Sequence, residues 1–266
     1  MKARALGLAA LTVLELPHHE QVSVAAQAGY THVGLRLVPV AGQPYEHPVD
    51  LAAIKARLAD TGVRVLDVEV FRLTAGTAVA QFEPALAAAA QLGARHILVH
   101  GADEDEARLL ETYGRLCDLA ARHGLVANLE PMPWVDVSSV AKALRILSGA
   151  RRANAGLLVD AIHFFRAGER VDALASVPRE YLHYAQFCDA RRERPADMQE
   201  IIRQARADRL MPGEGGLDLA GLLRALPADL PLSLEIPYAK PMPALERAQR
   251  AREATLRLLE QCALPS

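Results

Sequence analysis

The segment GLLVDAIHFFRAG, residues 156–168, passes from a wholly apolar run to charged side chains within a few positions. Leu157, Leu158 and Val159 lead directly into Asp160, and His163 follows three residues later. A continuous aliphatic run of this kind is typical of a strand that is covered on both faces, as in a parallel sheet. The segment therefore predicts a buried parallel strand whose carboxyl end carries polar groups.

The same succession of an apolar run and an amphipathic segment recurs along the whole chain, with Gly and Pro between the segments. The predicted strands lie at residues 5–11, 32–38, 63–71, 95–101, 125–131, 155–162, 181–190 and 230–237. The predicted helices lie at residues 20–28, 50–62, 78–92, 104–123, 137–148, 170–176, 196–207 and 244–262, with an extra one at 218–226. Asp50 and Gly62 are the expected caps of the second helix. Eight pairs in 266 residues give about 33 residues each, the size of a βαβ repeat.

Strict alternation of strand and helix fits either a closed eightfold barrel or an open doubly wound sheet. The open sheet usually carries a GxGxxG turn after its first strand, and this chain has none. Its glycine cluster, GEGG at 213–216, lies late in the sequence. The sequence therefore predicts one domain over residues 1–266, an α/β fold of the (β/α)8 TIM-barrel type.

The charge, the apolar runs and the cysteines of the sequence give no indication of nucleic-acid binding, a membrane span, a zinc site or disulfides. A net charge of −2 gives no electrostatic footprint for nucleic acid, and no run of 18 or more apolar residues suggests a membrane span. Cys117, Cys188 and Cys262 are far apart and form no CxxC pair, so the sequence indicates neither a zinc site nor a disulfide framework. A cytoplasmic protein is the expectation. Residues 244–262 carry an apolar stripe among many charges, which suits packing on a barrel and leaves a homodimer open.

Polar side chains end the last four predicted strands: Glu130, Asp160, Gln186 and Glu235. In a barrel these strands are neighbours, and their carboxyl ends meet at one mouth. Carboxylates gathered there would repel one another unless a cation lies among them. Three carboxylates and an amide oxygen are hard donors, which favours Mg²⁺ or Mn²⁺ over zinc.

Each of these residues also has an ordinary explanation. A single Asp or Glu after a strand is more often a helix N-cap or a surface ion pair. Four in register are harder to explain as independent caps, and Pro131 and Pro237 follow closely after two of them. His163 alone would be a structural residue, but beside Asp160 its imidazole could bond to a substrate oxygen.

Five motifs resemble the sugar phosphate isomerase/epimerase superfamily, the xylose-isomerase-like TIM-barrel family. They are NLEP (128–131), VDAIH (159–163), YAQFCDA (184–190), RLMPGEGGLDL (209–219) and LSLEIP (232–237). The resemblance runs from about residue 5 to the end of the sequence and is strongest from residue 128. That family also includes inosose isomerases and dehydratases, ketose 3-epimerases, hydroxypyruvate isomerases and 3-dehydroshikimate dehydratases.

The resemblance implies a divalent metal held by the residues at positions 130, 160, 186 and 235. It also implies that Glu130 and Glu235 exchange protons with substrate from opposite faces, as in the family's epimerases. His163 and Arg209 match substrate-contacting residues, and we expect Asp189 and Glu214, in the same motifs, to contact substrate too. Many members carry His where this chain has Gln186. Gln is shared with bacterial 3-dehydroshikimate dehydratases, and it strengthens the preference for Mg²⁺ or Mn²⁺.

Earlier strands offer further candidates, each with an alternative. Arg36 either points into the mouth to bind a phosphate or carboxylate, or forms an outward salt bridge. Glu69 and His100 either support the metal site from outside its ligand set or form a satisfied buried pair. Trp134 either walls the pocket or packs on its rim.

These residues predict a metal-dependent isomerase or epimerase of a small sugar, keto-sugar or polyol, working by proton transfer through an enediolate. The nearest alternative is a dehydratase of the 3-dehydroshikimate or inosose type. Two others remain: a DNA-repair enzyme similar to endonuclease IV, disfavoured by the lack of a basic groove, and a non-catalytic barrel that binds a polyol.

Overall fold

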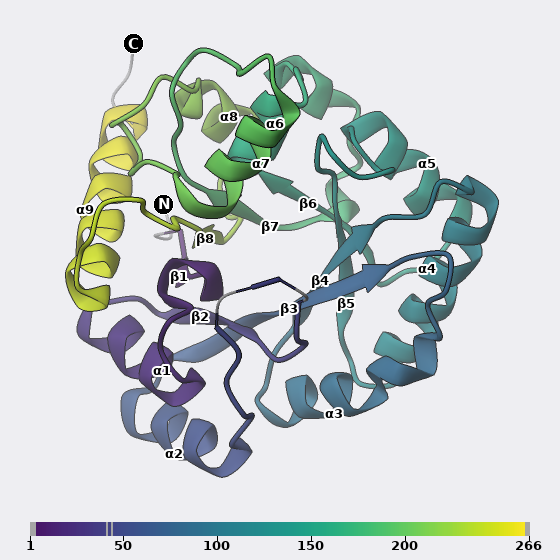
Figure 1. Ribbon diagram of the computed structural model, residues 1–266, viewed down its shortest axis with the longest axis horizontal. Helices are drawn as coiled ribbons and strands as arrows, with labels where there is room; N and C mark the ends of the chain where they lie inside the picture. The colour runs from purple at the N-terminus through teal and green to yellow at the C-terminus, as the bar shows by residue number, and fades with distance from the viewer. Residues whose placement is uncertain (1–3, 41, 44, 264–266) are drawn as a thin grey trace.

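The computed structural model describes residues 4–40, 42–43 and 45–263. Its strands form one closed parallel barrel in the order β1 to β8, with β8 paired to β1, and the helices surround this barrel (Figure 1). The predicted (β/α)8 fold is therefore confirmed. The strands are β1 Leu6–Leu8, β2 His32–Arg36, β3 Arg64–Leu73, β4 His96–Gly101, β5 Val126–Glu130, β6 Ala155–Asp160, β7 Leu182–Phe187 and β8 Leu232–Leu234.

The helices occupy the connections between strands, as the alternation predicts. The α-helices are α1 His18–Gln27, α2 Leu51–Thr61, α3 Glu83–Gln91, α4 Glu106–Ala121, α5 Val140–Ala150, α6 Ala161–Arg166, α7 Met198–Ala207, α8 Leu219–Ala225 and α9 Ala244–Ala263. Short 3-10 helices are η1 Ala10–Val13, η2 Val79–Phe82, η3 Val171–Ser176 and η4 Arg179–Tyr181. None of the described helices is both long and apolar enough to cross a membrane.

Local capping explains where several helices begin and end. The Asp50 side chain accepts a hydrogen bond from the Ala53 N–H at the start of α2, and Gly62 ends that helix with a positive φ of 70°. Glycine adopts this left-handed conformation without the steric cost that other residues meet. Both predicted caps are confirmed.

Three predicted elements differ in length or type. The apolar run 5–11 contains only the short strand β1, because Thr12 N–H bonds back to the Ala9 carbonyl and turns the chain into η1. The predicted strand 155–162 stops at Asp160, whose side chain caps α6 by accepting from the His163 N–H. The sixth predicted helix, 170–176, is the 3-10 helix η3.

Apolar side chains fill two regions on either side of the barrel wall. The larger region lies between the strands and the surrounding helices. The smaller one fills the barrel interior and consists of Leu66, Val70, Leu98, Leu158 and Tyr184. Val70 and Leu98 of this group also line the cavity at the carboxyl ends of the strands.

Candidate metal centre and catalytic cavity

A cavity of about 740 Å³ opens at the carboxyl ends of the strands. This volume lies in the range that binds small molecules. The polar and aromatic side chains that line it include Arg36, Glu69, Arg72, His100, Glu130, Trp134, His163, Arg206, Arg209 and Glu235. Asp160 and Gln186 are buried beside it, at the ends of β6 and β7.

Glu130 lies at the centre of one half of this site. One carboxylate oxygen, Oε2, is hydrogen-bonded to His100 Nε2 at 2.7 Å. The other, Oε1, lies 3.8 Å from His163 Nε2 and accepts no hydrogen bond from the described residues. Trp134 packs edge-on against the His163 ring, with 5.0 Å between ring centres. Glu130 therefore presents one buried oxygen that is free to bind another group.

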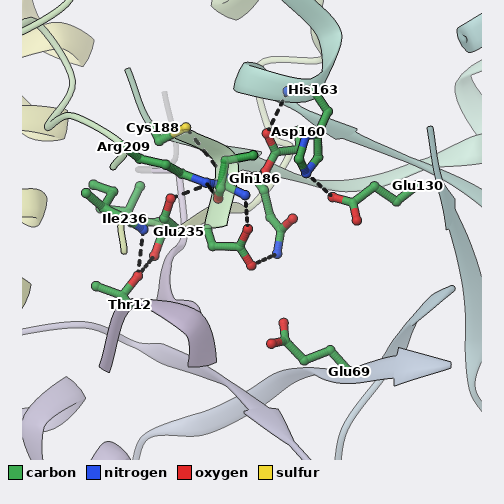
Figure 2. A network of polar contacts seen from close by, with 12 residues as sticks. Thr12, Glu69, Glu130, Asp160, His163, Gln186, Cys188, Arg209, Glu235 and Ile236 are labelled. Carbon is green, nitrogen blue, oxygen red and sulfur yellow. Dashed lines mark hydrogen bonds and ion pairs between the residues drawn. The ribbon is translucent and has the colours of Figure 1, made fainter. Parts of the chain in front are cut away.

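Arg209 lies between the two other carboxylates (Figure 2). Its Nη1 is 2.6 Å from Asp160 Oδ2, and its Nη2 is 2.6 Å from Glu235 Oε2. Its Nε donates to the Ala205 carbonyl at 2.7 Å, which fixes the direction of the side chain. Gln186 donates its amide N–H to Glu235 Oε1 at 2.9 Å. A guanidinium thus neutralises two of the four predicted metal ligands, an arrangement that the sequence did not predict.

Burial and mutual repulsion set the protonation of the carboxyl groups. Burial raises the pKa of Glu130 well above its usual range, and the neighbouring Asp160 and Glu235 raise it further. Burial also raises the pKa of Glu235 to about 7, although Arg209 opposes the shift. For Asp160 the effect of burial is outweighed by Arg209 and His163, and the pKa is lowered. Glu235 is consequently a carboxyl group that titrates near neutrality.

Both histidines of the site are neutral near pH 7. Burial lowers the pKa of His163 to about 4, although Asp160 acts in the opposite direction. Burial lowers the pKa of His100 well below its usual value, and His163 adds to this. A neutral imidazole keeps one nitrogen lone pair for a metal or a proton.

The donor set fits a divalent cation. Ligand atoms of Glu130, Asp160 and His163 all lie within 4.8 Å of one another. Glu130 Oε1 and Gln186 Oε1 are buried oxygens without a hydrogen-bond partner among the described residues. Buried polar atoms of this kind are rare in proteins unless a ligand, ion or water satisfies them. His163, predicted as a substrate contact, therefore also lies where a metal ligand could be.

Arg36 and Glu69 form the opposite wall of the cavity. Arg36 donates from Nε and Nη2 to Glu69 Oε1 at 3.0 and 2.7 Å, so Arg36 lies inside the mouth and not in an outward salt bridge. Figure 2 shows the Glu69 carboxylate directed toward Gln186 and Glu235 from the other side of the barrel.

Asp189 and Glu214, predicted to contact substrate, are not among the residues that line this cavity, and both make contacts within the protein. The Asp189 carboxylate accepts hydrogen bonds from four backbone N–H groups, those of Ala190, Gly213, Gly215 and Leu217. Glu214 pairs with Arg250 at 3.2 Å. Asp189 thereby shapes the loop that begins at Arg209.

Two arginines that line the cavity, Arg72 and Arg206, were not among the site residues predicted from the sequence. Arg72 is part of β3, which continues two residues beyond the predicted end at residue 71. Regular alternation would place Glu69 and Arg72 on opposite faces, and the irregularity between Val68 and Phe71 that changes this was not visible in the sequence. Arg206 lies in the last turn of α7, where nothing in the sequence distinguishes it from other surface arginines.

Comparisons with known proteins agree on the type of barrel. A family model described as a xylose isomerase-like TIM barrel matches residues 22–261. Two curated relatives are 3-dehydroshikimate dehydratases, from Pseudomonas aeruginosa (31% identical) and Pseudomonas putida (26% identical), each over 136 residues. These matches cover 50% of this chain and only 21% of each relative's length.

Solved structures match nearly the whole chain. A xylose isomerase-like TIM barrel/4-hydroxyphenylpyruvate dioxygenase fusion protein has a TM-score of 0.84 and 21% identity, over 98% of this chain and 44% of its own. The IOLI protein with a bound zinc atom has a TM-score of 0.79 and 18% identity, over 97% of this chain and 98% of its own. D-allulose 3-epimerase from Methylomonas sp. has a TM-score of 0.73 and 18% identity, over 97% and 98%. At these identities the structural matches show the fold alone.

Proposed function

Because the chain belongs to the xylose isomerase-like TIM-barrel family, we propose that it is a divalent-metal-dependent enzyme that moves a proton on a carbon next to a carbonyl group. The substrate is a small hydroxylated ketone, in keeping with the volume of the cavity. One observation carries this proposal: Glu130 and Glu235, two buried carboxylates from different strands, line the same cavity.

Glu130, Asp160, Gln186 and Glu235 would hold the metal, with the His163 nitrogen beside them. This set is rich in oxygen, which favours Mn²⁺ or Mg²⁺. When bound, the ion supplies positive charge to the carbonyl and hydroxyl oxygens of the substrate and so acidifies the C–H between them.

Glu235 is the general base of the proposed reaction. As a buried carboxylate that lines the cavity, it can take a proton from the substrate and release one. Arg209 keeps it oriented, since both guanidinium Nη atoms are committed to the carboxylates at positions 160 and 235. Glu130, or His163 beside it, returns a proton to the substrate.

The substrate decides the outcome of the proton transfer. Return of the proton to the opposite face gives an epimer, and return to the neighbouring carbon gives an isomer. Loss of a β-hydroxyl group gives a dehydrated product instead. The two 3-dehydroshikimate dehydratases among the relatives support dehydration as the second candidate.

The proposal is tested with the Mn²⁺-loaded protein in deuterated water. A panel of ketoses is examined for deuterium next to the carbonyl, and 3-dehydroshikimate and inosose are examined for a rise in ultraviolet absorbance. Deuterium without loss of water supports isomerisation or epimerisation, and a new chromophore supports dehydration. A chain that binds Mn²⁺ but produces neither result with any of these compounds would be a binding barrel, contrary to the proposal.

A further inference from the structure

The cavity is lined by three arginines besides Arg209. They are Arg36 at the end of β2, Arg72 near the end of β3 and Arg206 in the last turn of α7. All three line the cavity, together with Thr74. They come from three separate elements, so the cluster is a product of the fold and not of one basic stretch of sequence.

The three arginines line the same cavity as His100. Arg72 and His100 are register partners across β3 and β4. The His100 imidazole is hydrogen-bonded to Glu130, so it does not bond to any of the three arginines through that nitrogen.

Among the described residues, a carboxylate neutralises one of these three positive charges, that of Arg36. Arg36 is paired with Glu69 through Nε and Nη2, but its Nη1 is buried and has no hydrogen-bond partner among the described residues. Only 9% of the Arg36 side chain is exposed. Arg72 and Arg206 make no side-chain hydrogen bond or ion pair with the described part of the chain. The other carboxylates that line the cavity already face His100 and Arg209.

We propose that Arg36, Arg72 and Arg206 form a subsite for an oxyanion, so that the substrate of this cavity carries a carboxylate or phosphate group. The inference rests on the proposed function, because it names the class of substrate on which that reaction acts. Like charges held close together favour a ligand of opposite charge, and arginine matches the planar arrangement of carboxylate and phosphate oxygens. A neutral sugar would leave Arg72 and Arg206 without a charged partner. The subsite places the anionic end of the substrate at the mouth and its ketone end near Glu130 and Glu235.

Pairs of ligands with and without the anionic group test this subsite. Isothermal titration of the Mn²⁺-loaded protein compares shikimate with its neutral methyl ester, and fructose 6-phosphate with fructose. We expect the anionic member of at least one pair to bind about tenfold or more tightly, the effect of about one charged hydrogen bond. The pair that shows this preference identifies the oxyanion as a carboxylate or as a phosphate.

The double variant R72Q/R206Q is expected to lose most of that preference, because both side chains supply charge and make no internal contact. The matched control is R257Q, which removes an exposed arginine from the outer helix α9 and should keep the preference. Thermal unfolding verifies that all three proteins are folded. A parallel titration of the wild type at high salt should weaken binding of the anionic ligand and leave that of the neutral one unchanged.

Equal binding of the charged and neutral members of both pairs overturns the subsite, as does a double variant that keeps the full preference. These binding measurements need no turnover. An anion preference without deuterium exchange would therefore refute the proposed reaction alone, and exchange on neutral ketoses without an anion preference would refute the subsite alone.

Discussion

Glu235 combines complete burial with two close partners, Arg209 and Gln186. The variant Glu235→Gln keeps the size of the side chain and removes the proton acceptor. We expect proton exchange at the substrate carbon to slow by about 10²- to 10⁴-fold, the usual contribution of a general base. Solvent deuterium incorporation measures the rate, and circular dichroism verifies the fold. Glu253→Gln on α9 is the matched control and should exchange at the wild-type rate; full activity in Glu235→Gln would remove Glu235 from the mechanism.

Asp67 is a buried carboxyl group in β3 that no hydrogen bond from the described residues satisfies. Burial raises its pKa well above the usual range, and Glu69 and Glu235 raise it further. Its pKa is therefore higher in the folded chain than in the unfolded one. The unfolded chain loses this proton first as the pH rises, so the free energy of unfolding decreases above about pH 4.

Asp67→Asn removes this pH-dependent loss. We expect the variant to be more stable than the wild type at pH 8, by about 1.4 kcal/mol for each unit by which folding raises the pKa of Asp67. At about pH 4, where both side chains are neutral, the two proteins should differ little. Urea unfolding at the two pH values measures the difference, and a variant less stable than the wild type at pH 8 would contradict it.

At this scale the sequence predicted which polar residues end the last four strands, because strand periodicity places them in register. It did not predict that Arg209 would lie between Asp160 and Glu235. Arg209 is 49 positions from Asp160 and 26 positions from Glu235, and both contacts depend on how the loop after α7 folds. Nothing in the local pattern around residue 209 encodes its direction.

The loop that follows α7 is organised by one side chain. Asp189 accepts from the N–H groups of Gly213 and Gly215 at 3.0 Å and of Leu217 at 3.1 Å, and its backbone pairs with Leu210. At Gly215, a β-carbon would lie 2.4 Å from an Asp189 oxygen. The turn therefore requires both the carboxylate and the absence of a side chain opposite it.

Asp189→Ala leaves four backbone N–H groups without their acceptor, and that of Ala190 is buried. We expect the free energy of unfolding to fall by about 1–3 kcal/mol, the cost of one unsatisfied buried donor. Proton exchange should slow as well, since the loop positions Arg209. Denaturant unfolding measures the first effect. Asp229→Ala, which breaks an exposed pair with Arg179, is the control and should cost at most about 1 kcal/mol. Equal losses in the two variants would remove the organising role of Asp189.

Element boundaries were predicted best where a cap marks them. Asp50 and Gly62 bound α2 as expected because their side-chain and backbone preferences are local. The length of β3 was underestimated, since its last residues are held by pairing with β4 and not by their own hydrophobicity. The change from strand to η1 after Ala9 likewise depends on contacts with β8.

At the scale of the whole molecule, the carboxyl groups of the proposed metal centre should make the free energy of unfolding depend on bound metal. Mn²⁺ that binds only the folded chain should raise the free energy of unfolding by about 2.7 kcal/mol at a hundred times its Kd. For a chain of this size that corresponds to a rise in Tm of about 5–10 °C. Differential scanning calorimetry of protein treated with a chelator, with and without Mn²⁺, measures it.

Glu130→Gln is the informative variant for this prediction, because it replaces the carboxylate of a proposed metal ligand that is not bonded to Arg209. Its Tm should respond to Mn²⁺ much less than that of the wild type, whereas Glu253→Gln should respond fully. A wild-type Tm that stays constant up to millimolar Mn²⁺ would refute the metal centre itself.

The architecture as a whole was predictable because one unit of about 33 residues recurs eight times. The closed form followed from the absence of a dinucleotide-binding turn, and the pairing of β1 with β8 confirms it. The identity of the substrate was not predictable in the same way. It depends on side chains such as Arg72 and Arg206, which only the folded barrel brings together.

The closure of β1 on β8 has a consequence for synthesis on the ribosome. Strand β1 is made at the start of translation, but one of its two neighbours emerges only with residues 232–234. Until then the nascent chain exposes an unpaired strand edge, a surface on which aggregation begins. Slow translation of the final third of the message would prolong that exposure, so the demand for chaperones should rise with the time taken to reach β8.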